Sequence, residues 1–242
     1  MTSPPYAKRR SKTYGGINPD EYVDWFFPIS QELKRVLKPT GSFILNIKEP
    51  AINGERHTFV IQLTLALKQD GWRWVDEYCW HKKNSHPGKW NNRFRDSWER
   101  CLHFTKEKKF AMYQDAVMIP VGDWKKKRFK NLSQADRERN KSSLGNDFSR
   151  NVSNWKERDM VYPSNVLHLA TECRNRGHSA AFPIDLPIWF IKLFTQEGDV
   201  VLDPFIGGGT TALACQELNR HFIGIELNKD YYDLACSNLG LL

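Results

Sequence analysis

The spacing of hydrophobic and polar residues predicts two patterned stretches with a polar segment between them. In the first stretch the pattern indicates a helix from Asn18 to about Leu37, with Asn18 as its cap and Pro19 at its first position. Pro28 interrupts this helix and is expected to kink it. The run from Ser42 to Ile47 is typical of a buried parallel strand. The side chains expected on the buried side of the helix are Tyr22, Trp25, Phe26, Ile29, Leu33 and Val36.

The first stretch continues with one further helix and two further strands. The helix is expected from about His57 to Gln69, and Gly71 closes it. A strand is expected from Trp72 to Trp80, where alternate residues share one face, and another from Glu99 to Thr105. The alternate residues that should share a face are Trp72, Trp74, Asp76, Tyr78 and Trp80.

The second patterned stretch begins near Tyr162 and alternates strands with helices. Such alternation at both ends of a chain predicts an α/β fold, in which helices cover both faces of a mostly parallel sheet. The expected helices are residues 185–195, 209–218 and 228–239, and the expected strands are residues 199–203 and 221–226.

Residues 107–160 differ from both stretches because they are basic and show little periodicity. They hold 13 Lys and Arg against 8 Asp and Glu, which is five of the eight excess positive charges of the chain. We therefore expect three parts. Residues 1–106 and 161–242 form the two halves of one core, and residues 107–160 form an inserted subdomain.

Composition excludes several classes of protein. The 242 residues are 40% hydrophobic and 26% charged, which is enough to bury a core and excludes global disorder. No apolar run approaches the ~20 residues of a membrane-spanning helix, and Met1–Lys12 lacks the apolar core of a secretory signal. The five cysteines are scattered without a CxxC pair, which argues against a disulfide scaffold or a thiolate metal site and fits a reducing cytoplasm. The net charge of +8 favours a polyanionic partner.

Residues 200–211 are expected to form a strand, a glycine-rich turn and the start of a helix. Glycine lets the backbone pass close to a ligand. Glu226 follows about one strand–helix–strand step later, at a strand end, where a carboxylate can accept both hydroxyls of a ribose. Glycines alone are weak evidence, because dinucleotide enzymes and tight turns share them. The strand, the Asp203-Pro204-Phe205 lead and the spaced Glu226 together are much stronger evidence for a cofactor turn.

This segment resembles the S-adenosylmethionine motif of the DNA amino-methyltransferases. The resemblance implies that Glu226 is the acid that binds the ribose, and that Phe182 and Pro183 flank the methionine end of the cofactor. Residues 178–183 resemble the family's segment at this place, except that Ser179 stands where the family usually has proline. The residues of the glycine turn that the resemblance assigns to cofactor binding are Asp203, Pro204, Phe205, Gly207, Gly209 and Thr210.

Ser3-Pro4-Pro5-Tyr6 is a second signature. Alone it would be taken for a polyproline-like turn, but beside the cofactor motif it resembles the catalytic motif of the same family. The hydroxyl of Ser3 and the carbonyl of Pro4 can both accept hydrogen bonds from an exocyclic amine, which draws the nitrogen lone pair out of the base and toward the sulfonium methyl group. The two prolines hold that carbonyl rigid, and Tyr6 is expected to stack on a flipped base.

The first residue of this motif bears on the choice of base. In the family, serine is commonest in enzymes that act on N4 of cytosine, and aspartate is typical of N6-adenine enzymes. Ser3 therefore implies transfer to N4 of a flipped cytosine, with N6-adenine as the alternative because some serine forms act on adenine. A C5-cytosine enzyme is disfavoured, since that chemistry requires a Pro-Cys nucleophile and no cysteine here follows a proline.

The order of the parts, with the catalytic motif first and the cofactor motif last, resembles the permuted β class of the family. Residues 107–160 occupy the place of the target-recognition region. Residues 78–84 resemble the segment whose aromatic residue helps to hold the target base, which implies roles for Trp80 and Lys82. The residues expected to contact DNA phosphates are Lys8, Arg9 and Arg10 after the catalytic motif, unless they are only a solvated charge run, and Lys125, Lys126, Lys127 and Arg128 in the insertion.

One departure from the family concerns the N-terminal end. The family normally has a Gly-Asp segment, a helix and a central strand before the catalytic motif, whereas here the motif begins at Ser3. We therefore expect a shortened form, in which the neighbours of that strand lose hydrogen bonds and burial. A different segment in the place of the strand would contradict this hypothesis. A non-catalytic DNA-binding remnant and a nicotinamide dehydrogenase are the rival interpretations, although the dehydrogenase does not explain Ser3–Tyr6.

The resemblance also implies the ligands and the setting of the protein. The expected cofactor is S-adenosylmethionine and the expected partner is double-stranded DNA, in a prokaryotic or phage cytoplasm and without a membrane. The resemblance allows either a monomer or a homodimer. It also allows a cognate restriction endonuclease as a functional partner.

Overall fold

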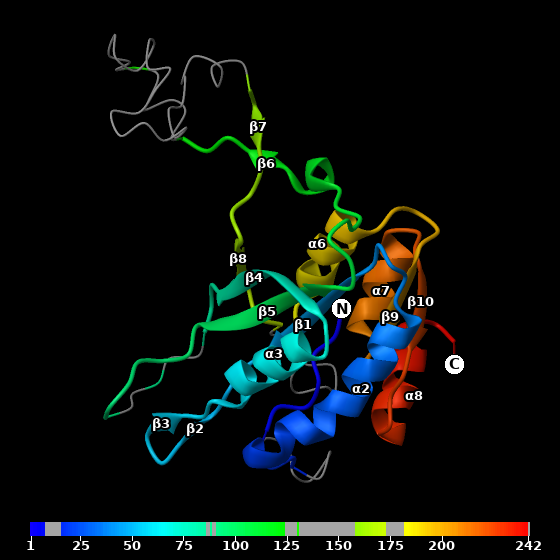
Figure 1. The fold of residues 1–242 in the computed structure, drawn as a ribbon. Helices are drawn as coiled ribbons and strands as arrows, with labels where there is room; N and C mark the ends of the chain where they lie inside the picture. The colour runs from blue at the N-terminus through cyan, green and yellow to red at the C-terminus, as the bar shows by residue number, and fades with distance from the viewer. Residues whose placement is uncertain are drawn as a thin grey trace. The chain divides into compact units, whose positions relative to one another are not determined.

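The computed structural model describes residues 1–7, 16–85, 88, 91–123, 130, 158–172 and 182–241. It contains two compact units (Figure 1). The larger unit is Met1–Tyr113 with Ser164–Leu242, and the smaller unit is Gln114–Pro163. The smaller unit interrupts the larger one in sequence near the expected insertion. That it recognises a target stays a prediction.

In the smaller unit, a short antiparallel pair brings its two ends together. Strand β6 (Ile119–Pro120) pairs with β7 (Met160–Val161). The 3-10 helix η2 (Gln114–Val117) precedes them, and the hydroxyl of Tyr162 donates to Asp115 Oδ1 over 2.9 Å.

The larger unit is built on two groups of strands. One is a four-stranded sheet in the order β1, β5, β4, β8, with antiparallel pairing at the first two contacts and parallel pairing between β4 and β8. The other is the parallel pair of β9 and β10. The strands are β1 (Ser42–Ile47), β4 (Arg73–Lys82), β5 (Trp98–Thr105), β8 (Val166–Leu169), β9 (Val200–Asp203) and β10 (His221–Gly224), and a separate hairpin holds β2 (Ala51–Ile52) and β3 (Glu55–Arg56).

The predicted α/β class is confirmed, but the four-stranded sheet is mixed and not mostly parallel, since β1 pairs antiparallel with β5 and makes a parallel bridge only with Thr2. β1 and β4 are joined through helix α3 (Phe59–Gln69), as parallel strands require. β5 follows β4 as a hairpin and pairs antiparallel with both strands, so it lies between them while they run parallel to each other. The hydrophobic pattern of a strand does not show into which gap of a sheet it inserts.

Residues 1 and 2 connect the two groups of strands. The amide of Thr2 donates to Ile44 O, and the amide of Asn46 donates to Thr2 O, both over 2.9 Å, which makes a single parallel bridge to β1. On the other side the amino group of Met1 lies 3.4 Å from Leu202 O of β9. Among the described residues, no other strand pairs with β1 or β9 at this place. Residues 1 and 2 are therefore a described backbone link between the two groups of strands.

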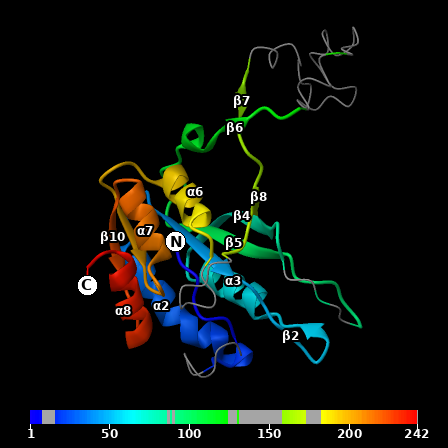
Figure 2. The same cartoon turned by 180° about the vertical axis from the view of Figure 1, so that it is seen from behind.

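Helices cover both faces of the four-stranded sheet (Figures 1 and 2). On one face, α2 (Tyr22–Val36) and α3 pack against β1 and β5 around a core that includes Phe26 and Phe104. On the other face, α6 (Asp185–Phe194) packs against β4 and β5, and its Phe190 ring lies 5.2 Å from the ring of Tyr78. The other helices of this unit are η1 (Pro19–Glu21), α7 (Thr210–Glu217) and α8 (Lys229–Asn238).

Two predictions about buried faces are wrong. Val36 lies at the end of α2 and is 50% exposed, whereas the next residue, Leu37, packs against the core. β4 has a bulge between Trp74 and Asp76, which moves the following side chains to the opposite face. Trp72 therefore packs on Phe104 on the side of α2 and α3, whereas Tyr78 packs on α6.

The described helices include none that is both long and apolar enough to span a bilayer. The cysteines in the described ranges, Cys79, Cys101, Cys215 and Cys236, are free thiols.

His103 makes the fold sensitive to acid. The residue is 1% exposed, its Nε2 lies 2.9 Å from Ser42 Oγ, and its Nδ1 has no hydrogen-bond partner in the described ranges. Burial disfavours the charged imidazolium and lowers the pKa of His103 from 6.5 to about 4. The unfolded chain therefore binds the proton first as the pH falls.

We predict that the contribution of His103 to the free energy of unfolding is fully present above pH 6.5 and is lost as the pH falls toward 4, because the pKa of His103 is lower in the folded chain than in the unfolded chain. A shift of this size corresponds to about 3 kcal/mol. The free energy of urea unfolding, measured at several pH values, should fall less steeply over this range in His103→Asn than in the parent. Equal slopes would contradict the prediction.

Candidate active site

The Ser3–Tyr6 motif begins where residues 1 and 2 leave the sheet, at the carboxyl end of β1. Two contacts fix its backbone. Thr2 is held in the sheet, and the hydroxyl of Tyr22 donates to the carbonyl of Pro5 over 2.9 Å. Tyr22 is fully buried at the start of α2. The first turn of α2 therefore fixes the position of Pro5 in the motif.

A buried polar cluster holds the aromatic end of the motif. The hydroxyl of Tyr6 donates to Oε2 of Glu99, and the ammonium group of Lys82 donates to Oε1 of the same carboxylate. Asn46 at the end of β1 donates to Glu99 Oε2 over 3.3 Å, and Glu99 is 6% exposed. A buried carboxylate is stable when donors and a cation satisfy it in this way. Glu99 is thus the anchor for Tyr6.

The hydroxyl of Tyr6 also lies 3.3 Å from Asn46 Oδ1. Burial raises the pKa of Tyr6 well above 10, and the charge of Glu99 raises it further. The tyrosine is therefore a neutral phenol that donates to Glu99.

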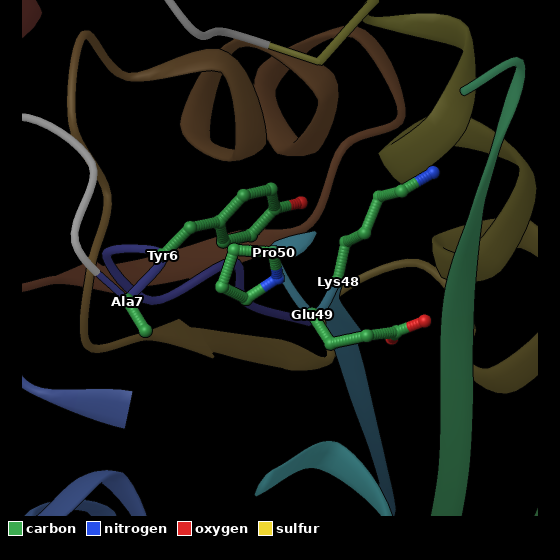
Figure 3. A pocket seen from close by; sticks show the side chains of 5 residues that line it. All are labelled: Tyr6, Ala7, Lys48, Glu49 and Pro50. Atoms are coloured by element: carbon green, nitrogen blue, oxygen red, sulfur yellow. The ribbon is translucent and has the colours of Figure 1, made fainter. Parts of the chain in front are cut away.

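A pocket opens beside Tyr6 (Figure 3). Its lining combines the ring of Tyr6 with the segment that follows β1. Burial lowers the pKa of Lys48 in this lining, although the charges of Asp96 and Glu99 act in the opposite direction. With its hydroxyl anchored and its ring partly exposed, Tyr6 presents a fixed aromatic surface at the pocket. The residues that line the pocket are Tyr6, Ala7, Lys48, Glu49 and Pro50.

Trp80 and Lys82 of β4, which are expected near the target base, contact each other, and Lys82 contacts Glu99. Trp80 is 4% exposed, and its indole N–H donates to Leu169 O over 3.3 Å. Lys82 lies 4.9 Å above the ring of Trp80 and is paired with Glu99. Their described contacts therefore support Tyr6 through Glu99. The pairing also leaves the charge of Lys82 engaged inside the protein.

Asp203 joins the catalytic motif to the cofactor turn. Its carboxylate accepts from Thr2 Oγ1 over 2.5 Å, from Thr211 Oγ1 over 2.6 Å and from the amide of Phe205 over 3.1 Å. Asp203 is 1% exposed. Asp203 therefore holds the two ends of the turn, at Phe205 and Thr211, and binds them to Thr2, the residue before Ser3.

The glycine turn follows directly after β9. Gly207 and Gly209 have φ angles of 54° and 89°, in the left-handed region that favours glycine. A Cβ on Gly209 would lie 3.3 Å from Ala235 of α8, so the helix packs closely on the turn. The turn therefore needs glycine both for its backbone conformation and for its packing.

Glu226 lies against this turn, just after β10. Its Oε2 accepts from the amide of Gly207 over 2.9 Å, and its Oε1 accepts from the amide of Asn228 over 2.8 Å. A carboxylate has about four acceptor sites, so both oxygens can still accept a hydroxyl group. The two acceptor oxygens of Glu226, beside a turn that lets a ligand approach closely, therefore fit the hydroxyl groups of an adenosyl ribose.

The other predicted cofactor residues lie in the turn or just before α6. Phe205 packs toward the core, with its ring centroid 5.8 Å from Trp25 of α2. Pro183 is buried and Phe182 is partly exposed just before α6. Pro204 follows β9, and Thr210 begins α7.

Several predicted DNA contacts lie outside the described residues. These are Lys8, Arg9, Arg10, Lys125, Lys126, Lys127 and Arg128, and their roles stay predictions.

The sheet covered on both faces, the glycine turn and the carboxylate after β10 define an α/β enzyme of the nucleotide-cofactor class. A family model described as DNA methylase, of the N6 and N4 methyltransferase type, matches residues 1–237. The chain belongs to this family, which confirms the predicted family and excludes the nicotinamide dehydrogenase. S-adenosylmethionine is the cofactor of the family.

Three individual proteins illustrate the similarity. The chain is 30% identical to the Type II methyltransferase M.HindIII of Haemophilus influenzae, over 97% of this chain and 76% of that protein. A solved structure titled PvuII DNA methyltransferase (cytosine-N4-specific) superposes with a TM-score of 0.72 at 23% identity, over 98% of this chain and 77% of that one. The M1.HpyAVI complex with SAM gives 0.60 at 21% identity, over 99% and 87%. These two structures share the fold.

Sequence reasoning placed Glu99 in a strand and gave it no role in the site. A signal was present, since an acidic residue opens a strand that is otherwise mostly apolar and buried. Its partners lie 17, 53 and 93 positions away, so no local pattern could connect them to it.

We predict that Glu99→Gln lowers the free energy of unfolding by about 3 kcal/mol, because Lys82 loses its partner in a buried site. Tyr6→Phe should cost about 1 kcal/mol. In a double-mutant cycle the two losses should be less than additive, since Glu99→Gln weakens the charge-assisted hydrogen bond that Tyr6→Phe removes. The control is Glu32→Gln on the exposed side of α2, which should leave stability unchanged. Strict additivity in urea unfolding would contradict the predicted contact.

Proposed function

We propose that the chain is a DNA methyltransferase that transfers the methyl group of S-adenosylmethionine to N4 of a flipped cytosine in duplex DNA. The observation that carries the proposal is the link through Asp203, because one carboxylate binds Thr2 beside Ser3 and Thr211 beside the glycine turn. A methyl donor in the turn and an amine at Ser3 would then face each other across a fixed distance.

Each motif has a chemical part in this proposal. The Ser3 hydroxyl and the Pro4 carbonyl accept from the exocyclic amine, so that its lone pair points at the methyl carbon. Tyr6 stacks on the base, and its anchored hydroxyl removes the need to order the ring during the reaction. Glu226 binds the ribose hydroxyls of the donor. S-adenosylmethionine supplies the methyl group as a sulfonium.

The choice of cytosine rests on serine at position 3, which is the residue type commonest among N4-cytosine enzymes. N6-adenine is the second candidate, because the same pair of acceptors can hold the amine of either base. The rival from another class is a non-catalytic protein that binds DNA, a remnant of such an enzyme. An assay of methyl transfer to duplex DNA separates this rival from both enzymes.

The first test is methylation of DNA in cells that express the chain, followed by digestion and nucleoside mass spectrometry. We expect N4-methylcytosine, and a loss of at least about 100-fold in Ser3→Ala because an acceptor for the amine is removed. Ser237→Ala, an exposed serine on α8, is the matched control. N6-methyladenine would overturn the base and keep the mechanism. No methylated nucleoside from the parent chain would contradict the proposed activity.

The second test concerns the cofactor. Glu226→Ala should weaken binding of S-adenosylhomocysteine by about tenfold or more, as expected for loss of a charge-assisted hydrogen bond. The parent should also prefer this ligand to its 2′-deoxyribose form, and the variant should lose that preference. Isothermal titration calorimetry measures both quantities. An unchanged preference would show that Glu226 does not bind the ribose.

A further inference from the structure

A loop, of which the structure describes residues 83–85, 88 and 91–97, lies between β4 and β5 at the same edge of the sheet as the Ser3–Tyr6 motif. The amide of Lys82 donates to Ser97 O over 2.7 Å and closes the base of the loop. Lys82 also reaches Glu99, which holds Tyr6. The base of the loop is therefore tied to the motif by side-chain contacts.

The carboxyl-terminal limb of this loop is anchored by Asp96. Asp96 binds Arg56 of β3 and lies 3.4 Å from Lys48 Nζ, at the end of β1. A third cation, Arg93, lies 3.2 Å from the same carboxylate. Although burial opposes the charged form, Arg56 and Lys48 lower the pKa of Asp96 below its usual value. The limb is thus held in place on the core.

Phe94 lies two residues before this anchor and is 93% exposed. Its neighbours in sequence are Arg93 and Arg95, and residues 82–100 hold six Lys and Arg against two Asp and Glu. The same limb ends at Trp98, which is 39% exposed and has Arg100 at 5.2 Å from its ring. A single exposed apolar residue is ordinary. Here an almost fully exposed phenylalanine lies between two arginines, on an anchored loop beside the motif. Such a group is suited to bind a polyanion whose interior is apolar, because the arginines can contact its charges and the phenylalanine its interior.

We propose that Phe94 inserts into the base stack of duplex DNA at the target pair, as a wedge that helps to extrude the target base toward Tyr6. This inference rests on the proposed function and adds a residue to it. Apolar side chains that enter between bases replace part of the lost stacking. The flanking arginines would bind the phosphates on either side. The wedge contributes only while the target base is stacked and paired.

The test compares single-turnover methylation of two duplexes that contain the site mapped from the methylated DNA. In one the target base is paired, and in the other it lies opposite an abasic position. Phe94→Ala should lose about tenfold or more on the paired duplex, and should remain within about twofold of the parent on the abasic one, because extrusion there requires less work. Phe94→Leu should lose less than Phe94→Ala. Ile61→Ala, at an apolar residue on α3 that is 58% exposed, should behave as the parent on both duplexes.

A fluorescent base analogue at the target position provides a second readout. Its signal on binding should rise less in Phe94→Ala than in the parent. Equal methylation rates for parent and variant on the paired duplex would overturn the wedge, as would an equal loss on both duplexes. If the parent chain transfers no methyl group to any DNA, the proposed function fails and the wedge fails with it.

Discussion

The arrangement of the site depends on the carboxylate of Asp203. A charge with 1% exposure is costly unless it is fully paired by donors. Asp203 meets this condition with two threonine hydroxyls and one backbone amide. These donors come from the segment before the catalytic motif, from the first turn of α7 and from the glycine turn. Satisfying one buried charge therefore fixes the position of the catalytic motif relative to the cofactor turn.

Glu99 acts in the same way at the other end of the motif. Asp203 holds Thr2, Tyr22 holds the carbonyl of Pro5, and Glu99 holds the hydroxyl of Tyr6. Four consecutive residues are thus supported at both ends and in the middle, and two of them are prolines with a fixed φ angle. Acceptors fixed before the reaction require little reorganisation in the transition state, which is the largest advantage that such a site can offer.

Local chemistry explains what could be predicted from the sequence. The helix cap at Asn18, the strand–turn–helix at residues 200–211 and the carboxylate at Glu226 are short-range patterns, and the structure has each of these elements where it was expected. The bulge in β4 and the insertion of β5 between β1 and β4 depend on partners that are distant in the sequence. The clusters around Asp203 and Glu99 have the same origin, since their donors come from segments up to 201 positions away. A carboxylate in a strand indicates that partners exist, but it does not identify them.

The junction between β1 and β9 shows how the two halves of the larger unit are held together. Along this seam the backbone hydrogen bonds of Met1 and Thr2 bridge the described strands at one end. Side chains provide the other contacts. Phe205 of the cofactor turn lies 5.8 Å and 6.4 Å from the rings of Trp25 and Phe26 on α2. Each such aromatic pair contributes about 1 kcal/mol beyond the area it buries. The cofactor half is therefore coupled to the catalytic half by α2 as well as by the sheet, and α2 is also the helix whose Tyr22 supports Pro5. α2 therefore contacts both the glycine turn and the Ser3–Tyr6 motif.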